Sequence, residues 1–241
     1  MTGLPAAVRA ALRAAAQPDK AGAMQAYMKS AMPFLGVAAP ARRALVRGAM
    51  KGRECADVEA LGQAMLELWR GATHREERYA ALDLLHLPRH DKLIALPLLP
   101  ALHEMLLTDP WWDFNDEISS RALPRLLQRH PQPMKATLRS WAVGEALWLR
   151  RAAMLAQRGV GAAAFDAVLL YDCILPSLLG EGAHATARDF FIRKGIGWAL
   201  RERSYAAPEE VQAFCVEYAS RLSPLTVREA LKAINRRSHA G

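Results

Sequence analysis

The sequence has little cysteine, few aromatic residues and no long apolar run. Among its 241 residues are three cysteines, Cys55, Cys173 and Cys215, and no Cys-x-x-Cys pair. A disulfide framework or a structural zinc site is therefore not expected, and a reducing compartment fits the chain. The most apolar stretch, residues 93–102, contains prolines and is shorter than the roughly 18 residues that a membrane span needs. We expect a soluble, cytoplasmic protein.

Sequence motifs of the common enzyme classes are also missing. There is no Gly-x-Ser-x-Gly elbow, phosphate loop or dinucleotide fingerprint, which excludes the usual hydrolase and nucleotide-binding signatures. His86 and His90 have the i, i+4 spacing of a helical metal pair, but Pro88 lies between them and should end the helix. The other histidines have no suitable neighbours in the sequence: His74, His103, His130, His184 and His239. We expect no metal and no cofactor.

Apolar residues are abundant and recur at helical spacing. Hydrophobic residues make up 52% of the chain and aromatic residues only 7%, a balance that favours helices over a β-sandwich. Pro or Gly interrupts the pattern regularly, as expected of short helices joined by tight turns. The predicted helices are 5–17, 20–31, 40–50, 56–70, 74–87, 91–107, 113–129, 132–141, 144–158, 164–179, 187–203, 208–221 and 224–235. The predicted fold class is all-α.

Two helix starts have local signals. Thr73 followed by Glu76 has the spacing of a capping box, in which each side chain satisfies a backbone N–H of the first turn. Pro208, Glu209 and Glu210 place a proline and two acids in a first turn, where a fixed φ and the helix dipole favour them.

The formal net charge is +8, from 32 Lys and Arg against 24 Asp and Glu. Positive charge of this size attracts polyanions, so nucleic acid is a reasonable partner. An arginine followed by small or apolar residues returns along the chain, at Arg78, Arg150, Arg193 and Arg228. If the pattern reflects repeats, the fold is an α-solenoid of stacked helical hairpins, and one arginine per repeat suits a phosphate backbone. Coincidence in an Ala- and Arg-rich chain is the alternative.

The segment around Trp111 and Trp112 is unusual. Asp113 and Asp116 follow, and helical spacing places Trp112 and Asp116 on one face. One interpretation is that Asp109 or Asp113 caps the helix and that the tryptophans belong to the core. Capping does not explain Asp116, which lies beyond the first turn. A carboxylate beside an indole face is suited to binding a cation.

Two further clusters carry aromatic and basic residues. Phe191, Lys194 and Trp198 form one helical stripe, in which Gly195 and Gly197 allow a close approach, either of a ligand or of a packed helix. Adjacent Arg150 and Arg151 follow Trp148, but they point about 100° apart on a helix, so at most one of them faces any single site. A solvated face is the other interpretation of this pair.

Together these segments resemble the AlkD-like family of DNA alkylation repair glycosylases. The matching motifs run from about residue 25 to residue 232. They are Tyr27-Met28-Lys29 with residues 33–37, Pro40-Ala41-Arg42-Arg43-Ala44-Leu45, Trp111-Trp112-Asp113 with Asp116, Trp148-Leu149-Arg150-Arg151, residues 190–202, and residues 222–225 leading to Arg228-Glu229-Ala230-Leu231. Because the motifs occur in the same order, the resemblance is specific. The segment 159–188 departs from it, being longer and richer in Gly and Ala.

The resemblance implies a single domain over residues 1–241, an α-solenoid of HEAT-like repeats with a concave basic groove for duplex DNA. It implies a cofactor-free monomer in the bacterial cytoplasm, on the nucleoid when bound to DNA, that releases N3- or N7-alkylated purines such as 3-methyladenine and 7-methylguanine. By motif position, the family's catalytic aspartate corresponds to Asp116, and its cleft tryptophans correspond to Trp112 and Trp198. The residues expected at the DNA are Arg151, with Arg150 as the alternative, and Tyr27, Phe191, Lys194 and Arg43.

The residues fit that chemistry. A cationic alkylpurine leaves without a proton donor, so one fixed carboxylate that stabilises an oxocarbenium-like sugar is sufficient. The alternatives are a non-catalytic HEAT-like module that binds damaged or branched DNA, and a helical-repeat protein scaffold. Asp116 between Trp112 and Trp198 favours the enzyme, because a pure DNA binder has no need for a carboxylate near phosphates.

Overall fold

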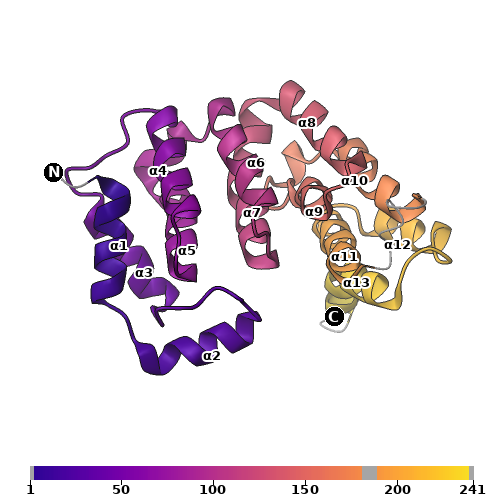
Figure 1. Ribbon diagram of the computed structural model, residues 1–241. Coiled ribbons are helices and arrows are strands. Elements are labelled where there is room, and N and C mark those ends of the chain that lie inside the picture. The colour runs from indigo at the N-terminus through magenta and orange to yellow at the C-terminus, as the bar shows by residue number, and fades with distance from the viewer. Residues whose placement is uncertain (1–2, 181–188, 239–241) are drawn as a thin grey trace. The chain divides into compact units, whose positions relative to one another are not determined.

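The protein is helical throughout the part that the computed structural model describes, residues 3–180 and 189–238, where no strand occurs (Figure 1). The α-helices are α1 (Leu4–Ala14), α2 (Pro18–Met28), α3 (Ala39–Ala49), α4 (Val58–Arg70), α5 (Arg75–Asp83), α6 (Leu99–Leu107), α7 (Trp112–Arg129), α8 (Pro131–Val143), α9 (Leu147–Leu155), α10 (Ala167–Leu179), α11 (Phe190–Ser204), α12 (Pro208–Glu217) and α13 (Pro224–Ser238). Short 3-10 helices span Leu84–His86, Pro88–Leu93, Leu96–Leu98 and Ala162–Ala164. The predicted all-α fold is confirmed.

The chain divides into two compact units, one up to Met105 and one from Leu106. In the first unit α1 packs on α3 and α4 packs on α5, while α1 also contacts α4 and α5. Helix α2 runs crosswise to these helices (Figure 1). The assignment of residues 1–241 to a single domain stays a prediction.

The predicted capping box at the start of α5 is wrong. The carboxylate of Glu76 instead accepts the backbone N–H groups of Leu35, Gly36 and Val37 at 2.9, 2.9 and 3.0 Å, which fixes the loop before α3. It is Glu77 that accepts the N–H of Thr73, at 2.9 Å. Both glutamates are fully buried. The N–H groups of this loop have no helical carbonyl to bond to, so the carboxylate of Glu76 serves as their acceptor. The expected start of α12 at Pro208 is confirmed.

Two predicted helices, 74–87 and 91–107, are shorter than the apolar pattern indicated. Helix α5 ends at Asp83, and α6 begins only at Leu99. The chain between them contains Pro88 and Pro97, which have no N–H to donate, and it runs through three short 3-10 helices instead. The apolar spacing continues across the prolines, so the sequence pattern could not distinguish an α-helix from short 3-10 helices here.

In the second unit α9 contacts α7, α8, α10 and α11, so it lies at the centre of that unit. Its neighbour α11 packs closely on α13, and α10 packs on α8. The core between these helices includes Leu155, Ile174, Ile192, Ile196 and Leu200, all essentially without exposed surface. The packing of α7, α9 and α11 therefore fixes the positions of the side chains that these helices direct away from the core.

Two stretches singled out in the sequence extend past the described residues. The segment 159–188 contains the 3-10 helix at Ala162–Ala164 and α10, and residues 181–188 of it, with His184, lie outside the described residues, as does His239. The predicted helix 187–203 is observed from Phe190. Among the described residues, no helix is both long and apolar enough to cross a membrane.

Candidate active site

The tryptophan segment, Trp111 and Trp112, lies at the start of α7, directly after a turn of the chain. Asp109 has a left-handed backbone, with φ of 46°, and Pro110 follows, so the chain turns sharply before the helix begins. Trp111 is the residue at the N-cap, and no side chain caps the helix there. The interpretation of Asp109 or Asp113 as a cap is therefore wrong. Asp116 lies on the second turn of α7.

Asp116 forms a buried ion pair with Arg151 of α9. The Oδ1 atom of Asp116 accepts hydrogen bonds from Nε and Nη2 of Arg151, at 2.9 and 2.7 Å. The Arg151 side chain is 2% exposed and the Asp116 side chain 16% exposed. Within residues 3–180 and 189–238 no hydrogen bond reaches Oδ2. One carboxylate oxygen is thus anchored and the other remains available to a ligand.

A glycine makes room for this arginine. Nη1 of Arg151 donates to the backbone oxygen of Phe191 on α11. A Cβ at position 195 would lie 3.3 Å from that same Nη1, closer than most side chains approach a neighbour. Gly195 therefore gives Arg151 the space to reach both partners. The close approach that the sequence predicted at Gly195 is made by a side chain of the protein itself.

Burial and charge act in opposite directions on the carboxyl of Asp116. Its pKa is raised above the ordinary value because burial disfavours the charged form, and the Coulombic attraction and hydrogen bonds of Arg151 oppose that rise. Arg158 also favours the charged form, whereas Asp113 disfavours it. Arg151 thus favours the charged carboxylate in a place where burial disfavours it.

Trp198 on α11 is surrounded by cations. The guanidinium or ammonium groups of Arg151, Arg158, Lys194 and Arg201 lie 5.3, 5.2, 5.1 and 5.9 Å from its ring centroid. The predicted pairing of Lys194 with Trp198 on one helical stripe is observed. Rings this close to cations attract them through their quadrupole. The indole therefore already interacts with positive charge in the free protein.

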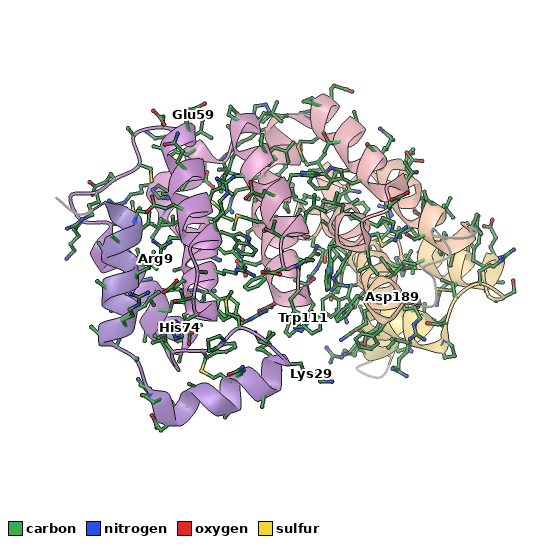
Figure 2. The ribbon with its side chains drawn as sticks, viewed as in Figure 1. Arg9, Lys29, Glu59, His74, Trp111 and Asp189 are labelled. Atoms are coloured by element: carbon green, nitrogen blue, oxygen red, sulfur yellow. The ribbon has the colours of Figure 1, made fainter. Side chains whose placement is uncertain are left out.

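Phe191 takes part in a separate aromatic cluster. Its ring lies 5.5 Å from that of Trp111 and 5.0 Å from that of Trp148, and the two tryptophans are 6.2 Å apart. Figure 2 labels Trp111 at the start of α7 and Asp189 at the start of α11. Asp189 caps α11 by accepting the N–H of Phe191 at 2.8 Å. Trp111 is half-buried in this cluster, which agrees with its predicted packing role.

Two clefts of this unit are lined by predicted site residues. The first, here called the acidic cleft, has a volume of about 590 Å³ and is lined by Trp112, Asp113, Asp116, Glu117, Ser120, Arg121, Arg158, Gly159 and Glu202. The second, here called the basic cleft, has a volume of about 470 Å³ and is lined by Arg158, Trp198, Arg201, Glu202, Tyr205, Lys232, Ala233 and Arg236. Arg158 and Glu202 line both clefts, so the clefts are neighbours. The structure thus places Trp112 beside Asp116, as predicted, and Trp198 in the adjoining cleft.

Sequence reasoning missed Arg158, Glu202 and Glu229. Arg158 donates to the hydroxyl of Ser120 at 3.3 Å and lies over Trp198, and Glu202 accepts the N–H of Gly159 at 3.1 Å. A signal for Arg158 existed, because it follows Arg151 by seven residues, two helical turns. Nothing in the local sequence indicated the two acids, since their partners are far away along the chain.

The remaining predicted DNA-binding residues differ in exposure. Tyr27 on α2 is 80% exposed. Arg43 is 43% exposed and donates to Asp83 at 3.3 Å. Arg150 and Arg151 are both buried, which favours positioning roles over phosphate contacts. Contacts of these residues with DNA stay predictions.

The arginines of the suggested repeat do not share one environment. Arg78 and Arg150 are buried, whereas Arg228 is exposed. A row of equivalent phosphate-binding arginines is therefore not formed. Among the residues that the structure describes, no group of three or more His, Cys, Asp and Glu side chains could hold a metal ion.

Comparison with known proteins shows which family the chain is similar to. A sequence profile described as DNA alkylation repair enzyme matches residues 8–234. A solved structure described as a predicted DNA alkylation repair enzyme from Enterococcus faecalis has 28% sequence identity and a TM-score of 0.76. The match covers 90% of this chain and 95% of that one. No curated protein matches the chain.

Proposed function

Because the chain belongs to the DNA alkylation repair enzyme family, we propose that it is a DNA glycosylase for positively charged N3- and N7-alkylated purines in duplex DNA. 3-Methyladenine and 7-methylguanine are the simplest such bases. The observation that carries the proposal is the partly exposed Asp116 carboxylate, which is anchored through one oxygen and lines a cleft with Trp112. The protein acts as a cytoplasmic monomer and needs no cofactor, because the cationic base is already a good leaving group.

The reaction moves positive charge from the base to the sugar. As the N-glycosidic bond lengthens, its electron pair goes to the base, which leaves neutral, and the sugar becomes oxocarbenium-like. Oδ2 of Asp116, the unanchored oxygen, stabilises that charge or accepts a hydrogen bond from the attacking water. The water adds its oxygen to C1′ and loses a proton to solvent. Such stabilisation is effective because the carboxylate is fixed before the reaction starts.

A Coulomb estimate gives the size of this effect. At about 4 Å and an effective dielectric constant near 20, the carboxylate attracts the sugar by about 4 kcal/mol. The Arg151 guanidinium, about twice as far from the sugar, opposes this by about 2 kcal/mol. The remaining 2 kcal/mol or so corresponds to about a 30-fold acceleration when it acts only in the transition state. Trp112 and Trp198 add cation–π attraction for the charged nucleotide.

The basic cleft suits the DNA backbone. Its cations are Arg158, Arg201, Lys232 and Arg236, with Glu202 as the acid on its wall. Lys232 and Arg236 are exposed side chains of α13 and can reach phosphates without leaving a buried partner. Since the two clefts are neighbours, phosphates bound here hold the damaged nucleotide near Asp116.

Removal of the two α13 charges tests this role. We expect the double variant Lys232→Gln/Arg236→Gln to bind duplex DNA more weakly and to reduce the slope of log K against log salt by up to about 2, one unit for each lost phosphate contact. Fluorescence anisotropy at several salt concentrations measures the slope. Arg221→Gln, which removes a charge from an exposed residue outside the cleft, should change the slope less. Equal slopes in wild type and the double variant would remove the basic cleft from the DNA interface.

The enzymatic activity is tested directly by base release. We expect the wild-type protein to liberate free 7-methylguanine from a duplex that contains it, leaving an abasic site, while an undamaged duplex loses no base. Chromatography of the soluble fraction detects the base. If the protein binds the damaged duplex but releases no base, it is not a glycosylase. That outcome would support the alternative of a non-catalytic DNA-binding module, which the basic cleft alone also favours.

The pH dependence follows from the ionisation of Asp116. Only the charged carboxylate stabilises the sugar, and burial raises its pKa above the ordinary value of about 3.9. As pH falls through this raised pKa the carboxyl becomes protonated, so base release should decline at a higher pH than for an exposed aspartate. Single-turnover rates from neutral pH down to the ordinary pKa of aspartate, corrected for spontaneous loss, measure the decline. A wild-type rate that shows no decline down to the pH at which an exposed aspartate becomes protonated would contradict the role of the charged form.

A further inference from the structure

Glu229 on α13 lies at the polar edge of Trp198. The indole Nε1–H donates to Oε2 of Glu229 at 3.1 Å, and Nη1 of Arg201 donates to the same oxygen at 3.1 Å. The Glu229 side chain is only 15% exposed. The single polar group of the ring is therefore bound by a largely buried carboxylate.

The approach of α13 to α11 depends on Gly197. A Cβ at this position would lie 2.7 Å from Cβ of Glu229 and 2.9 Å from the backbone oxygen of Thr226, distances that side chains do not tolerate. The hydroxyl of Thr226 also donates to the backbone oxygen of Arg193, at 3.2 Å. The first turns of α13 are thus fixed on α11, and Glu229 is held next to the ring.

We propose that Glu229 is a positioning residue that orients Trp198 and, by pairing with Arg201, offsets part of the positive charge around the ring, so that the ring can attract the cationic nucleotide. The proposal rests on the proposed function, in which the face of Trp198 holds that nucleotide. A tryptophan ring rotates with broad freedom about χ2, its second side-chain torsion. A hydrogen bond from Nε1 restricts this rotation. A charged acceptor forms a stronger bond than a neutral one and adds negative potential at the ring. Glu229 thereby determines which way the face points and how strongly it attracts a cation.

A purely structural role is the competing explanation. In that case Glu229 neutralises Arg201 and fastens α13, and its loss weakens all functions equally. Glu210 provides the matched control, because it pairs with Arg203 and accepts from the Tyr171 hydroxyl without any contact with Trp198. Glu210→Gln therefore breaks a comparable ion pair on the neighbouring helix.

The first readout is spectroscopic and needs no activity. In protein labelled with ¹⁵N, the indole N–H resonance of Trp198 is assigned by its absence in Trp198→Phe. We expect Glu229→Gln and Glu229→Leu to shift this resonance upfield, with the larger shift in the leucine variant, and Glu210→Gln to leave it in place. An unchanged resonance in both Glu229 variants would overturn the proposal. Glu229→Gln keeps the side-chain shape, so the test does not depend on the fold of the leucine variant.

The second readout separates the damaged base from DNA in general. A duplex with 2′-fluoro-7-methylguanine is cationic and resists cleavage, so binding can be measured alone. We expect Glu229→Gln to weaken its binding about two- to fivefold, the size of a partial loss of cation–π attraction, and to leave an undamaged duplex unaffected. Equal weakening of both duplexes, or the same pattern in Glu210→Gln, would assign Glu229 a structural role only. Failure of wild-type base release would remove the proposed function while leaving the indole readout intact.

Discussion

Asparagine at position 116 is expected to slow the release of 7-methylguanine by up to about 1,000-fold, since the whole attraction of about 4 kcal/mol is lost while the repulsion by Arg151 remains, and binding of the damaged duplex should stay within a few-fold of wild type. The variant keeps the shape of the side chain and removes the charge that acts on the sugar. Because the sugar becomes strongly charged only in the transition state, the loss appears in the rate and not in the affinity. Single-turnover kinetics with enzyme in excess measure the rate.

Asp113→Asn is the matched control for this experiment. Asp113 lines the same cleft, about one helical turn before Asp116. Arg151 donates its hydrogen bonds to Asp116. We expect Asp113→Asn to release the base at close to the wild-type rate, with a slight gain in the charged form of Asp116 because a like charge is removed. Equal losses in the two variants would mean that the cleft needs negative charge in general and no particular carboxylate.

Replacement of Arg151 by methionine is expected to lower the free energy of unfolding by about 3–5 kcal/mol. The change leaves the Asp116 carboxylate buried without its cation and without two hydrogen bonds. It also removes the donor to Phe191. Loss of the guanidinium raises the pKa of Asp116 further, so base release at neutral pH should fall as well. Urea denaturation measures the stability.

The double variant Arg151→Met/Asp116→Asn separates the pair from its parts. We expect it to be more stable than Arg151→Met alone, because no buried charge is left unpaired. It should remain inactive, because the carboxylate is absent. A double variant that is destabilised by the sum of the two single changes would show that the residues do not interact in the folded protein.

Much of the helical fold follows from the sequence because apolar spacing and proline positions act locally. The helices that were predicted too long, at 74–87 and 91–107, contain or adjoin prolines whose effect depends on how the chain packs nearby. Glu76 illustrates a second reason. Its spacing from Thr73 fits a capping box, but a buried loop 40 residues away competes for the same carboxylate. Local patterns cannot show such a competition.

The sequence indicated candidate residues for the site but not the contacts between them. The position of Asp116 beyond the first turn indicated an acid that does not cap the helix. Adjacent Arg150 and Arg151 left the choice open, because a rotation of about 100° separates them and only the packing of α9 decides which one faces α7. Gly195 indicated a close approach, but whether a ligand or a side chain fills the space depends on a residue 44 positions earlier in the chain.

The central claim is that the carboxylate of Asp116 stabilises positive charge on the sugar, and a stable mimic of that sugar tests it most directly. A duplex with a pyrrolidine in place of the sugar is cationic at that position, and a tetrahydrofuran duplex is its neutral counterpart. This claim predicts that the wild-type protein binds the pyrrolidine duplex about 30-fold more tightly than the tetrahydrofuran duplex, and that Asp116→Asn loses this preference or reverses it, because the repulsion by Arg151 remains. Equal binding of the two duplexes by wild type, or a preference that survives in Asp116→Asn, would contradict it.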